Sequence, residues 1–306
     1  MLPQRPLGRD GPPVPVLGFG AWPIGGGMGA VDDTAALATI RAAIDCGLTL
    51  LDTAQAYHSS EALIGRVLRD AGRDRVFLAT KVSGRYGRAD IAAALDASLR
   101  ALGTDRIDLY QLHSWNPKYP IEESMSVLLD AQRAGKVHHL GVSNFNAAHL
   151  AQTLALGRIV STQNRYNAID RDDEADALPF CAHAGVGYLA HSALAKGLLG
   201  GTYTPQTIFP PDDERAAFRR FRGAEFAAHL AVVEELKTFA QAKGCTLVAL
   251  SLAWLLRRPE VTCVLVGARS PEQVRAQAAA ATLTFTTSEL AEIETILARL
   301  PRTPER

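Results

Sequence analysis

The sequence is poor in cysteine and has no long apolar run. Its four cysteines, Cys46, Cys181, Cys245 and Cys263, are far apart, and no two form a Cys-x-x-Cys pair. This spacing excludes the common zinc and dithiol motifs and favours free thiols in a reducing compartment. No apolar stretch approaches the length of a membrane span, and the first residues carry no apolar signal segment. We therefore expect a soluble protein of the cytoplasm.

An excess of charge of either sign is also missing. The 306 residues hold 32 Lys and Arg against 32 Asp and Glu, so the formal net charge is zero at pH 7. Nothing in this balance favours nucleic acid or an anionic membrane as a partner. The apolar fraction of 47% is enough for a large core, and no linker or change of composition divides the chain. We expect one domain over residues 1–306.

What the chain does have is one arrangement repeated along its length: a helical pattern, a glycine and a short apolar run. The glycines that follow helical patterns are Gly47, Gly72, Gly103, Gly135, Gly157 and Gly185. Glycine adopts the left-handed conformation that ends a helix without steric cost, so each is expected to do so here. With one strand before the first repeat and one late in the chain, the predicted strands are 16–20, 48–52, 76–81, 107–113, 137–143, 159–163, 186–191 and 261–266.

Strands that alternate with helices predict a parallel sheet of the α/β class, and eight units predict a closed (β/α)8 TIM barrel. A doubly wound open sheet is the alternative. The segment 6–18 predicts an N-terminal β-hairpin with Asp10-Gly11 at its turn. After a long loop at 201–223, helical patterns near 225–243, near 246–257 and around residues 290–300 predict extra C-terminal helices.

Ionisable residues end three successive predicted strands. Asp52 ends the first of them, Lys81 the second and His113 the third, while Tyr57 follows five residues after Asp52. In a barrel of parallel strands the carboxyl ends converge on one mouth, where active sites lie. Each residue alone has an ordinary explanation, such as a structural ion pair or core packing. Together at one mouth they favour catalysis.

These four side chains suit the protonation of an oxygen. A phenol titrates near pH ~10, too high for a ready proton donor at neutrality. A nearby ammonium lowers that pKa, and a carboxylate positions the ammonium. Tyr57 is therefore the candidate acid, with Lys81 and Asp52 to tune it. His113 is a candidate hydrogen-bond partner for the substrate oxygen.

A glycine-rich segment at 25–30 satisfies the pattern G-x-G-x-x-A, and Asp52 follows at about the distance of the ribose-binding acid of a Rossmann unit. The context does not match, because Trp22-Pro23 separate these glycines from the strand and the next helix starts late. We interpret the segment as a loop. The adjacent His138 and His139 lie on one strand and point to opposite faces, so no metal site is expected.

Seven short motifs follow one another along the chain. They are LGFGAW at 17–22, DTAQAY at 52–57, ATK at 79–81, DLYQLH at 108–113, GVSNF at 141–145, QNRYN at 163–167 and GARSPEQ at 267–273. With these motifs in this order the chain resembles the aldo-keto reductase family over essentially its whole length. The resemblance implies a (β/α)8 barrel that reversibly reduces an aldehyde or ketone to an alcohol. It also implies a preference for NADP(H) over NAD(H), bound without a Rossmann domain.

The resemblance implies site residues as well. Tyr57 would be the general acid, with Lys81 and Asp52 beside it, and His113 would orient the carbonyl. The cofactor would contact Gly20, Ala21, Trp22, Asp52, Ser143, Asn144, Gln163, His191, Ser192, Ala193, Leu194, Lys196, Gly267, Arg269, Gln273 and Gln277. Trp22, Tyr57, His113 and Trp115 would line the pocket for a small carbonyl substrate. An oligomer is not required.

Arg269 has a separate physical argument. Ser270, Pro271 and Gln273 have the marks of a helix start, with Ser as N-cap, Pro at N1 and Gln at the capping-box position. A helix N-terminus beside a guanidinium suits a phosphate. The extra phosphate of NADP is the expected occupant.

Three residues depart from the family's usual pattern. His191 stands where an aromatic ring commonly stacks on the nicotinamide, and Ala193 replaces a common proline. Gln277 stands where an asparagine usually meets the adenine edge. Since an imidazole stacks with less area, the first two are expected to affect cofactor affinity. The four catalytic candidates match the family.

Two other functions stay open at this point. A lyase or isomerase barrel would use Lys81 to form a Schiff base and needs no nicotinamide. A non-catalytic or slow NADP(H)-sensing regulatory subunit of the same fold would bind the cofactor without rapid turnover. Tight NADPH binding with no borohydride-trappable adduct would exclude the Schiff-base enzyme. Measurable NADPH oxidation that is abolished in Tyr57→Phe would separate a reductase from the regulatory subunit.

Overall fold

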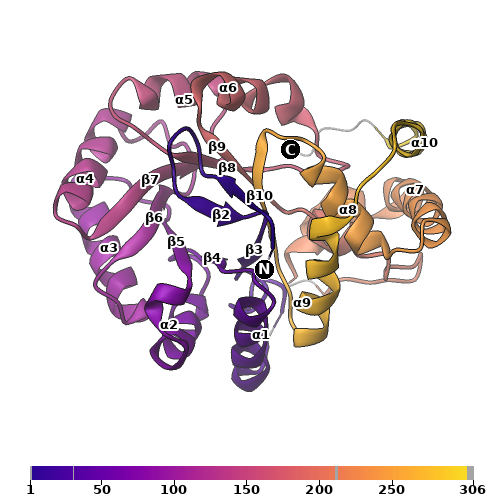
Figure 1. Cartoon of the computed structure of the whole chain (residues 1–306), viewed down its shortest axis with the longest axis horizontal. Helices are drawn as coiled ribbons and strands as arrows, with labels where there is room; N and C mark the ends of the chain where they lie inside the picture. Colours follow the sequence, from indigo (N-terminus) through magenta and orange to yellow (C-terminus); the bar gives the residue numbers. More distant parts are fainter. Residues whose placement is uncertain (1, 30, 211–212, 302–306) are drawn as a thin grey trace.

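Eight parallel strands close into a barrel at the centre of the molecule (Figure 1). The structure is a computed structural model and describes residues 2–29, 31–210 and 213–301. The barrel strands are β3 (Leu17–Gly20), β4 (Leu50–Asp52), β5 (Phe77–Val82), β6 (Ile107–Leu112), β7 (Val137–Ser143), β8 (Ser161–Arg165), β9 (Gly187–His191) and β10 (Val261–Val266). Neighbours follow chain order, and β10 closes the ring against β3. The predicted barrel is confirmed, and the open sheet is excluded.

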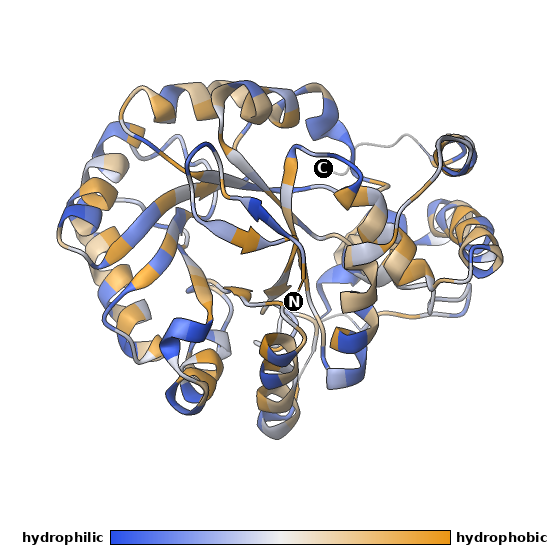
Figure 2. Ribbon diagram, in the orientation of Figure 1, coloured by the Kyte–Doolittle hydropathy of each residue, from blue (hydrophilic) through white to orange (hydrophobic). Residues whose placement is uncertain are grey.

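Helices surround the barrel and alternate hydrophobic and hydrophilic residues along their length (Figure 2). They are α1 (Asp33–Asp45), α2 (Ser60–Ala71), α3 (Arg88–Leu102), α4 (Ile121–Arg133), α5 (Ala147–Leu154), α6 (Ala177–Ala184), α7 (Gly223–Ala242), α8 (Leu247–Leu256), α9 (Pro271–Ala278) and α10 (Thr287–Leu297). Their buried apolar faces pack on the outer faces of the strands. Because both faces of each strand are covered, most strands are largely apolar, and β8, with the sequence STQNR, is the clear exception.

The glycine prediction is right at most positions and wrong at one. Gly103 ends α3 in the left-handed conformation, with φ 64° and ψ 38°, and Gly47, Gly72, Gly135 and Gly185 also have positive φ. Gly157 does not. A β-carbon there would lie 3.2 Å from the side chain of Leu129. Close packing, rather than backbone conformation, therefore favours glycine at position 157.

Side chains inside the barrel form two layers of different character. Successive residues of a strand face opposite sides, so Leu50 and Asp52 share one face of β4. The lower layer is apolar and includes Leu50, Ala79, Leu109, Leu189, Cys263 and Leu265. The upper layer is polar, and its members Asp52, Lys81, Gln111 and Gln163 are buried and joined by hydrogen bonds. The carboxyl ends of the strands thus surround a buried polar layer.

A β-hairpin covers the other end of the barrel (Figure 1). Its antiparallel strands are β1 (Gln4–Pro6) and β2 (Pro13–Pro15), as predicted. Leu7 and Val14 are fully buried against the lower apolar layer. Arg5 donates to the main-chain oxygens of Leu256, Arg258 and Val261, where α8 ends and β10 begins. The hairpin therefore closes the amino end of the barrel and leaves the carboxyl end for a site.

Two helices are additional to the repeating pattern. Helix α7 follows β9 and precedes α8, and α10 follows α9; the two lie side by side at one edge of the molecule (Figure 1). Glu294 of α10 accepts hydrogen bonds from Arg171, Trp254 and Arg257, which ties the last helix to the barrel. The predicted extra C-terminal helices are confirmed.

No single helix within residues 2–29, 31–210 and 213–301 is long and apolar enough to span a membrane. Helices α7 and α8 meet the length and composition test only as a pair, and they meet at a bend of 90°.

Candidate active site

A cavity of about 780 Å³ opens at the carboxyl ends of the strands. Most residues predicted to bind cofactor or substrate line it. They are Gly20, Trp22, Asp52, Tyr57, His113, Ser143, Asn144, Gln163, His191, Ser192, Ala193, Leu194, Lys196, Gly267, Arg269, Gln273 and Gln277. The fold therefore brings together side chains from seven of the eight barrel strands or the loops that follow them. Their individual roles stay predictions.

Lys81 lies directly beneath this cavity. Its side chain is fully buried, and its Nζ donates to Oδ2 of Asp52 at 2.7 Å and to the carbonyl of Thr53 at 2.9 Å. Burial alone disfavours the charged ammonium, but Asp52 and Tyr57 together outweigh that penalty and raise the pKa of Lys81. Lys81 is consequently a fixed positive charge under the phenol of Tyr57.

The phenol oxygen of Tyr57 lies 3.4 Å from Nζ of Lys81. Burial raises the pKa of Tyr57, and the opposing effect of Lys81 offsets only part of the rise. The expectation that Lys81 brings this pKa below its ordinary value is therefore wrong. The reason is that the tyrosine is half-buried, and its charged form loses more solvation than the ammonium returns. The phenol is protonated at neutral pH.

Asp52 is held from three sides. In addition to Lys81, the side-chain amide of Gln163 donates to its Oδ1 at 2.7 Å and that of Gln111 at 3.4 Å. The carboxylate is buried, and these donors replace the water that it loses. Its position at the end of β4, next to β5, follows from the parallel register that places Asp52 opposite Ala79.

His113 follows β6 and faces the phenol of Tyr57. The two rings are 5.5 Å apart between centroids and meet edge to face at 72°. Burial, reinforced by the charge of Lys81, lowers the pKa of His113 to about 3, so the imidazole is neutral at physiological pH. Its Nδ1 lies 2.7 Å from the hydroxyl of Ser83. A neutral imidazole held in this way offers its other nitrogen, Nε2, to the cavity.

His191, at the end of β9, makes two hydrogen bonds with its ring. Nδ1 pairs with Oγ of Ser192 and Nε2 with Oδ1 of Asn144, both at 3.0 Å. Burial, with smaller effects of Lys81 and other cations, lowers the pKa of His191 to about 3. The ring lines the cavity, as the resemblance implies, and its Nε2 is bound to Asn144 after β7, which β8 separates from β9.

The far part of the cavity meets the start of α9. Ser270 caps this helix, Pro271 is its first residue, and the side-chain oxygen of Gln273 accepts from the main-chain N–H of Arg269 at 2.7 Å. The predicted helix start is confirmed. Arg269 is exposed and donates to the carbonyl of Met28 at 3.2 Å. Gln277 is buried and donates to the carbonyl of Gly267 at 2.8 Å.

A side chain that the sequence did not single out joins two walls of the cavity. Glu214, in the loop 201–223, accepts from the indole of Trp22 at 3.1 Å and pairs with Nζ of Lys196 at 2.9 Å. Trp22 follows β3 and Lys196 follows β9, so the carboxylate bridges the loops on either side of β10. Tyr203 and Arg215 of the same loop also line the cavity. The only sequence signal was the length of the loop.

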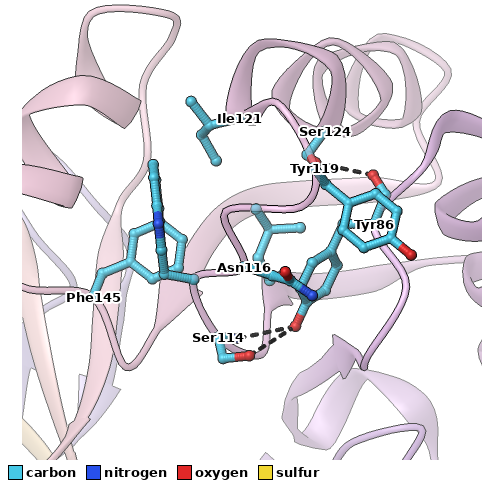
Figure 3. Close-up of a pocket in the computed structure, with 9 residues that line it drawn as sticks. Tyr86, Ser114, Asn116, Tyr119, Ile121, Ser124 and Phe145 are labelled. Atoms are coloured by element: carbon cyan, nitrogen blue, oxygen red, sulfur yellow. Dashed lines mark hydrogen bonds between the residues drawn. The ribbon is translucent and has the colours of Figure 1, made fainter.

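Besides Lys81, two predicted site residues lie outside the lining of this cavity. Ala21 is buried beneath it. Trp115 stacks on His149, with ring centroids 3.9 Å apart, and borders a separate space of about 10 Å³, room for one water molecule. Figure 3 shows this small space, with Tyr86 beside Ser114 and Phe145 opposite. A contact between Trp115 and a substrate stays a prediction.

The glycine-rich segment is a loop, as interpreted. Gly25 and Gly27 are packed too tightly for a side chain, against the main chain of Tyr57 and the indole of Trp22 respectively. Ala30, the last residue of the pattern, lies outside the described residues. His138 is exposed beside Asp108, whereas His139 stacks on Phe77. Among the described residues no group of three or more His, Cys, Asp or Glu side chains is placed to hold a metal ion.

Known proteins share this architecture and much of this sequence. The sequence profile of the Aldo/keto reductase family matches residues 16–298. The chain is 35% identical to the aldo-keto reductase YhdN of Bacillus subtilis (strain 168), covering 92% of this chain and 89% of the relative. It is 31% identical to the NADH-specific methylglyoxal reductase of Escherichia coli (strain K12), covering 91% and 93%.

A solved structure agrees in fold as well. The glycerol dehydrogenase AKR11B4 from Gluconobacter oxydans superposes with a TM-score of 0.89 at 32% sequence identity, covering 98% of this chain and 96% of that one. The family match spans all eight barrel strands and every residue discussed above as a candidate for the site. The chain therefore belongs to the aldo/keto reductase family and is an NAD(P)H-dependent oxidoreductase.

Proposed function

We propose that this protein reduces a small aldehyde or ketone to an alcohol, reversibly, with NADPH as the preferred cofactor and Tyr57 as the proton donor. The observation that carries the proposal is the arrangement around the phenol. Lys81 lies 3.4 Å from its oxygen, Asp52 lies 2.7 Å from Lys81, and the neutral ring of His113 faces it across the cavity. This is an acid with a fixed cation below it and a hydrogen-bond donor beside it.

The cavity suits a nicotinamide dinucleotide. Its volume of about 780 Å³ is within the range of cofactor sites, and it reaches from Tyr57 to the start of α9. The side-chain oxygen of Gln277 is buried in its lining and has no hydrogen-bond partner among the described residues. A buried acceptor without a donor is costly, so this atom supports a ligand that brings an N–H, such as an adenine amine.

When bound, the nicotinamide supplies the hydride. The protein supplies the proton and the groups that orient the substrate. Lys81 stabilises negative charge on the phenol oxygen as the proton of Tyr57 moves to the substrate. His113 is neutral and donates through Nε2 to the same substrate oxygen, which fixes the orientation of the carbonyl. The side-chain amide of Gln163 donates its N–H to Asp52. The side-chain oxygen of Gln163 can therefore accept a hydrogen bond from a carboxamide.

Arg269 supports the choice of NADP(H). Arg269 lines the cavity directly before Ser270, the N-cap of α9, and a phosphate there would meet a cation and the positive end of the helix dipole. The Escherichia coli relative is named as NADH-specific, so the family contains both preferences and the distinction needs a direct test. Other names among the relatives, a methylglyoxal reductase and a glycerol dehydrogenase, favour small oxygen-rich substrates.

The test is a spectrophotometric assay of NADPH and NADH oxidation with aldehydes, hydroxyketones and α-dicarbonyls, and of NADP⁺ reduction with short polyols. We expect turnover with at least one small carbonyl class and a higher kcat/KM with NADPH. Cofactor binding without turnover on any class would instead favour the regulatory function. A borohydride-trapped adduct on Lys81 would favour a Schiff-base enzyme.

We place the protein in the cytoplasm on the state of its thiols. Cys46, Cys181, Cys245 and Cys263 are all free, as in proteins of reducing compartments. By its family resemblance we also expect the protein to be active without a second subunit.

A further inference from the structure

A chain of hydrogen bonds joins the ends of three barrel strands beside Tyr57. His113 follows β6, Asn144 follows β7, and His191 with Ser192 ends β9. Ser192 Oγ lies 3.0 Å from His191 Nδ1, and His191 Nε2 lies 3.0 Å from Asn144 Oδ1. The side-chain amide of Asn144 then donates to the main-chain carbonyl of His113 at 2.9 Å.

The main-chain carbonyl of His113 determines which atom donates and which accepts in each of these hydrogen bonds. A carbonyl oxygen only accepts, so Asn144 must present its NH₂ group to His113 and its oxygen to His191. That oxygen also only accepts, so Nε2 of His191 must carry the proton. Nδ1 of the neutral ring then accepts from the hydroxyl of Ser192. Turning the amide over would set two oxygens against each other, so one arrangement satisfies every member.

The hydrogen bonds of this chain stabilise two residues whose backbone conformations are unusual. Asn144 and Ser192 have φ values of 58° and 55°, in the left-handed region that is uncommon for residues other than glycine. Such conformations persist where the surroundings determine them. His191 bonds to the side chains of both residues, and Asn144 also donates to Ser143 at 3.1 Å.

From this geometry we infer that His191 is a positioning residue, which holds the Asn144 amide, and through it the main chain of His113, in the orientation that cofactor and carbonyl require. The inference rests on the proposed function. Stacking on a nicotinamide, the role implied by family resemblance, needs only a flat ring. The hydrogen bonds need an N–H at the position of Nε2, which phenylalanine lacks and glutamine can supply.

The two roles predict opposite results for His191→Phe. If stacking alone matters, the larger apolar ring binds NADPH as tightly as the wild type or more tightly. If the imidazole holds Asn144, the dissociation constant for NADPH rises about 5- to 10-fold, the loss expected of one hydrogen bond. We expect kcat to fall as well, because His113 loses its support. The binding constant is read from quenching of tryptophan fluorescence, independently of turnover.

Two further variants separate positioning from general damage. His191→Gln keeps an N–H near the same point and should recover most of the affinity. In an Asn144→Ala background, His191→Phe should have almost no additional effect, since the partner is already gone. Equal effects of His191→Phe in both backgrounds, or tighter NADPH binding by His191→Phe alone, would overturn the inference while leaving the proposed function intact. A wild type that binds neither NADPH nor NADH would overturn both.

Discussion

The ammonium of Lys81 lies 3.4 Å from the phenol oxygen of Tyr57 and 4.9 Å from the centroid of its ring. The two side chains come from the segment after β4 and from β5, which are neighbours in the barrel. Lys81 is buried and salt-bridged to Asp52, so its charge cannot move away from the phenol. Burial nevertheless raises the pKa of Tyr57. The enzyme therefore keeps a protonated acid over a fixed cation, ready for negative charge to develop.

Removing one member of the buried pair should destabilise the protein more than removing both. Lys81→Met leaves the Asp52 carboxylate buried without its cation, at a cost of about 3–5 kcal/mol in the free energy of unfolding. Adding Asp52→Asn removes the unpaired charge and should recover a large part of that loss, although neither variant should be active. Urea unfolding of both single variants and the double variant measures this. A double variant whose loss equals the sum of the two single losses would show that the charges are not coupled.

Ser83 should determine which ring nitrogen of His113 carries the proton, and thereby affect catalysis. The hydroxyl of Ser83 lies 2.7 Å from Nδ1 of His113, and a proton donated there keeps the ring's own proton on Nε2, which faces the cavity. Ser83→Ala should lower kcat about 5- to 20-fold with a small change in cofactor affinity, on the scale of one hydrogen bond lost in the transition state. Ser83→Thr retains the hydroxyl and is the matched control. If alanine and threonine at this position give the same kcat, the hydroxyl has no such role.

Low pH should lower the free energy of unfolding, because two partly buried histidines, His113 and His191, are neutral in the folded protein. Burial holds the pKa of both His113 and His191 at about 3 in the folded protein, against about 6.5 in an unfolded chain. Between these values the unfolded state binds more protons, so stability is complete above about pH 6.5 and is lost progressively as pH falls toward 3. With allowance for partial exposure, each ring should cost about 1 kcal/mol per pH unit in this window.

The measurement is urea unfolding at pH 7.5 and pH 5.5. His191→Gln removes one of the two titrating groups, so its stability should fall distinctly less than that of the wild type between these pH values. The same pH dependence in both proteins would mean that His191 titrates normally in the folded state.

Arg269 should distinguish the two nicotinamide cofactors. Arg269→Ala removes the guanidinium beside the N-terminus of α9 and should raise the KM for NADPH about 10-fold, since charge-assisted bonds to a phosphate are the stronger kind. The KM for NADH, which lacks that phosphate, should change less than twofold. Arg275 makes a suitable control, because it is exposed on the same helix and pairs with Glu272. Equal losses with both cofactors in Arg269→Ala would place the phosphate elsewhere.

The sequence was enough to predict the barrel because its signals are local. Strand β7 begins and ends where the pattern predicted, as does β10, and the ionisable ends of β4, β5 and β6 needed only the rule that parallel strands finish on one side. Gly157 shows the limit of such rules. Its neighbour Leu129 belongs to α4, one helix before the α5 that Gly157 follows, and nothing in the local sequence indicates that contact.

The parts of the site that sequence reasoning missed all depend on distant loops. Glu214 reaches Trp22 across 192 positions of the chain, and neither residue has a local signal for the other. The link between Asn144 and His191 likewise requires that β7, β8 and β9 be placed side by side first. The direction of the Tyr57 pKa was wrong for a related reason. Proximity of a cation can be read from motifs, but the depth of burial that opposes it comes only from the assembled walls.

The central claim is that Tyr57 gives its proton to the substrate oxygen, and Tyr57→Phe tests it most directly. The variant should keep its affinity for NADPH within about threefold while kcat for carbonyl reduction falls 10²- to 10⁴-fold, the usual contribution of a general acid. Tyr110→Phe is the control, because the hydroxyl of Tyr110 is buried on β6 and has no hydrogen-bond partner in the described part of the chain. Its removal should leave turnover unchanged. A Tyr57→Phe enzyme that retains more than a tenth of the wild-type kcat would contradict the account.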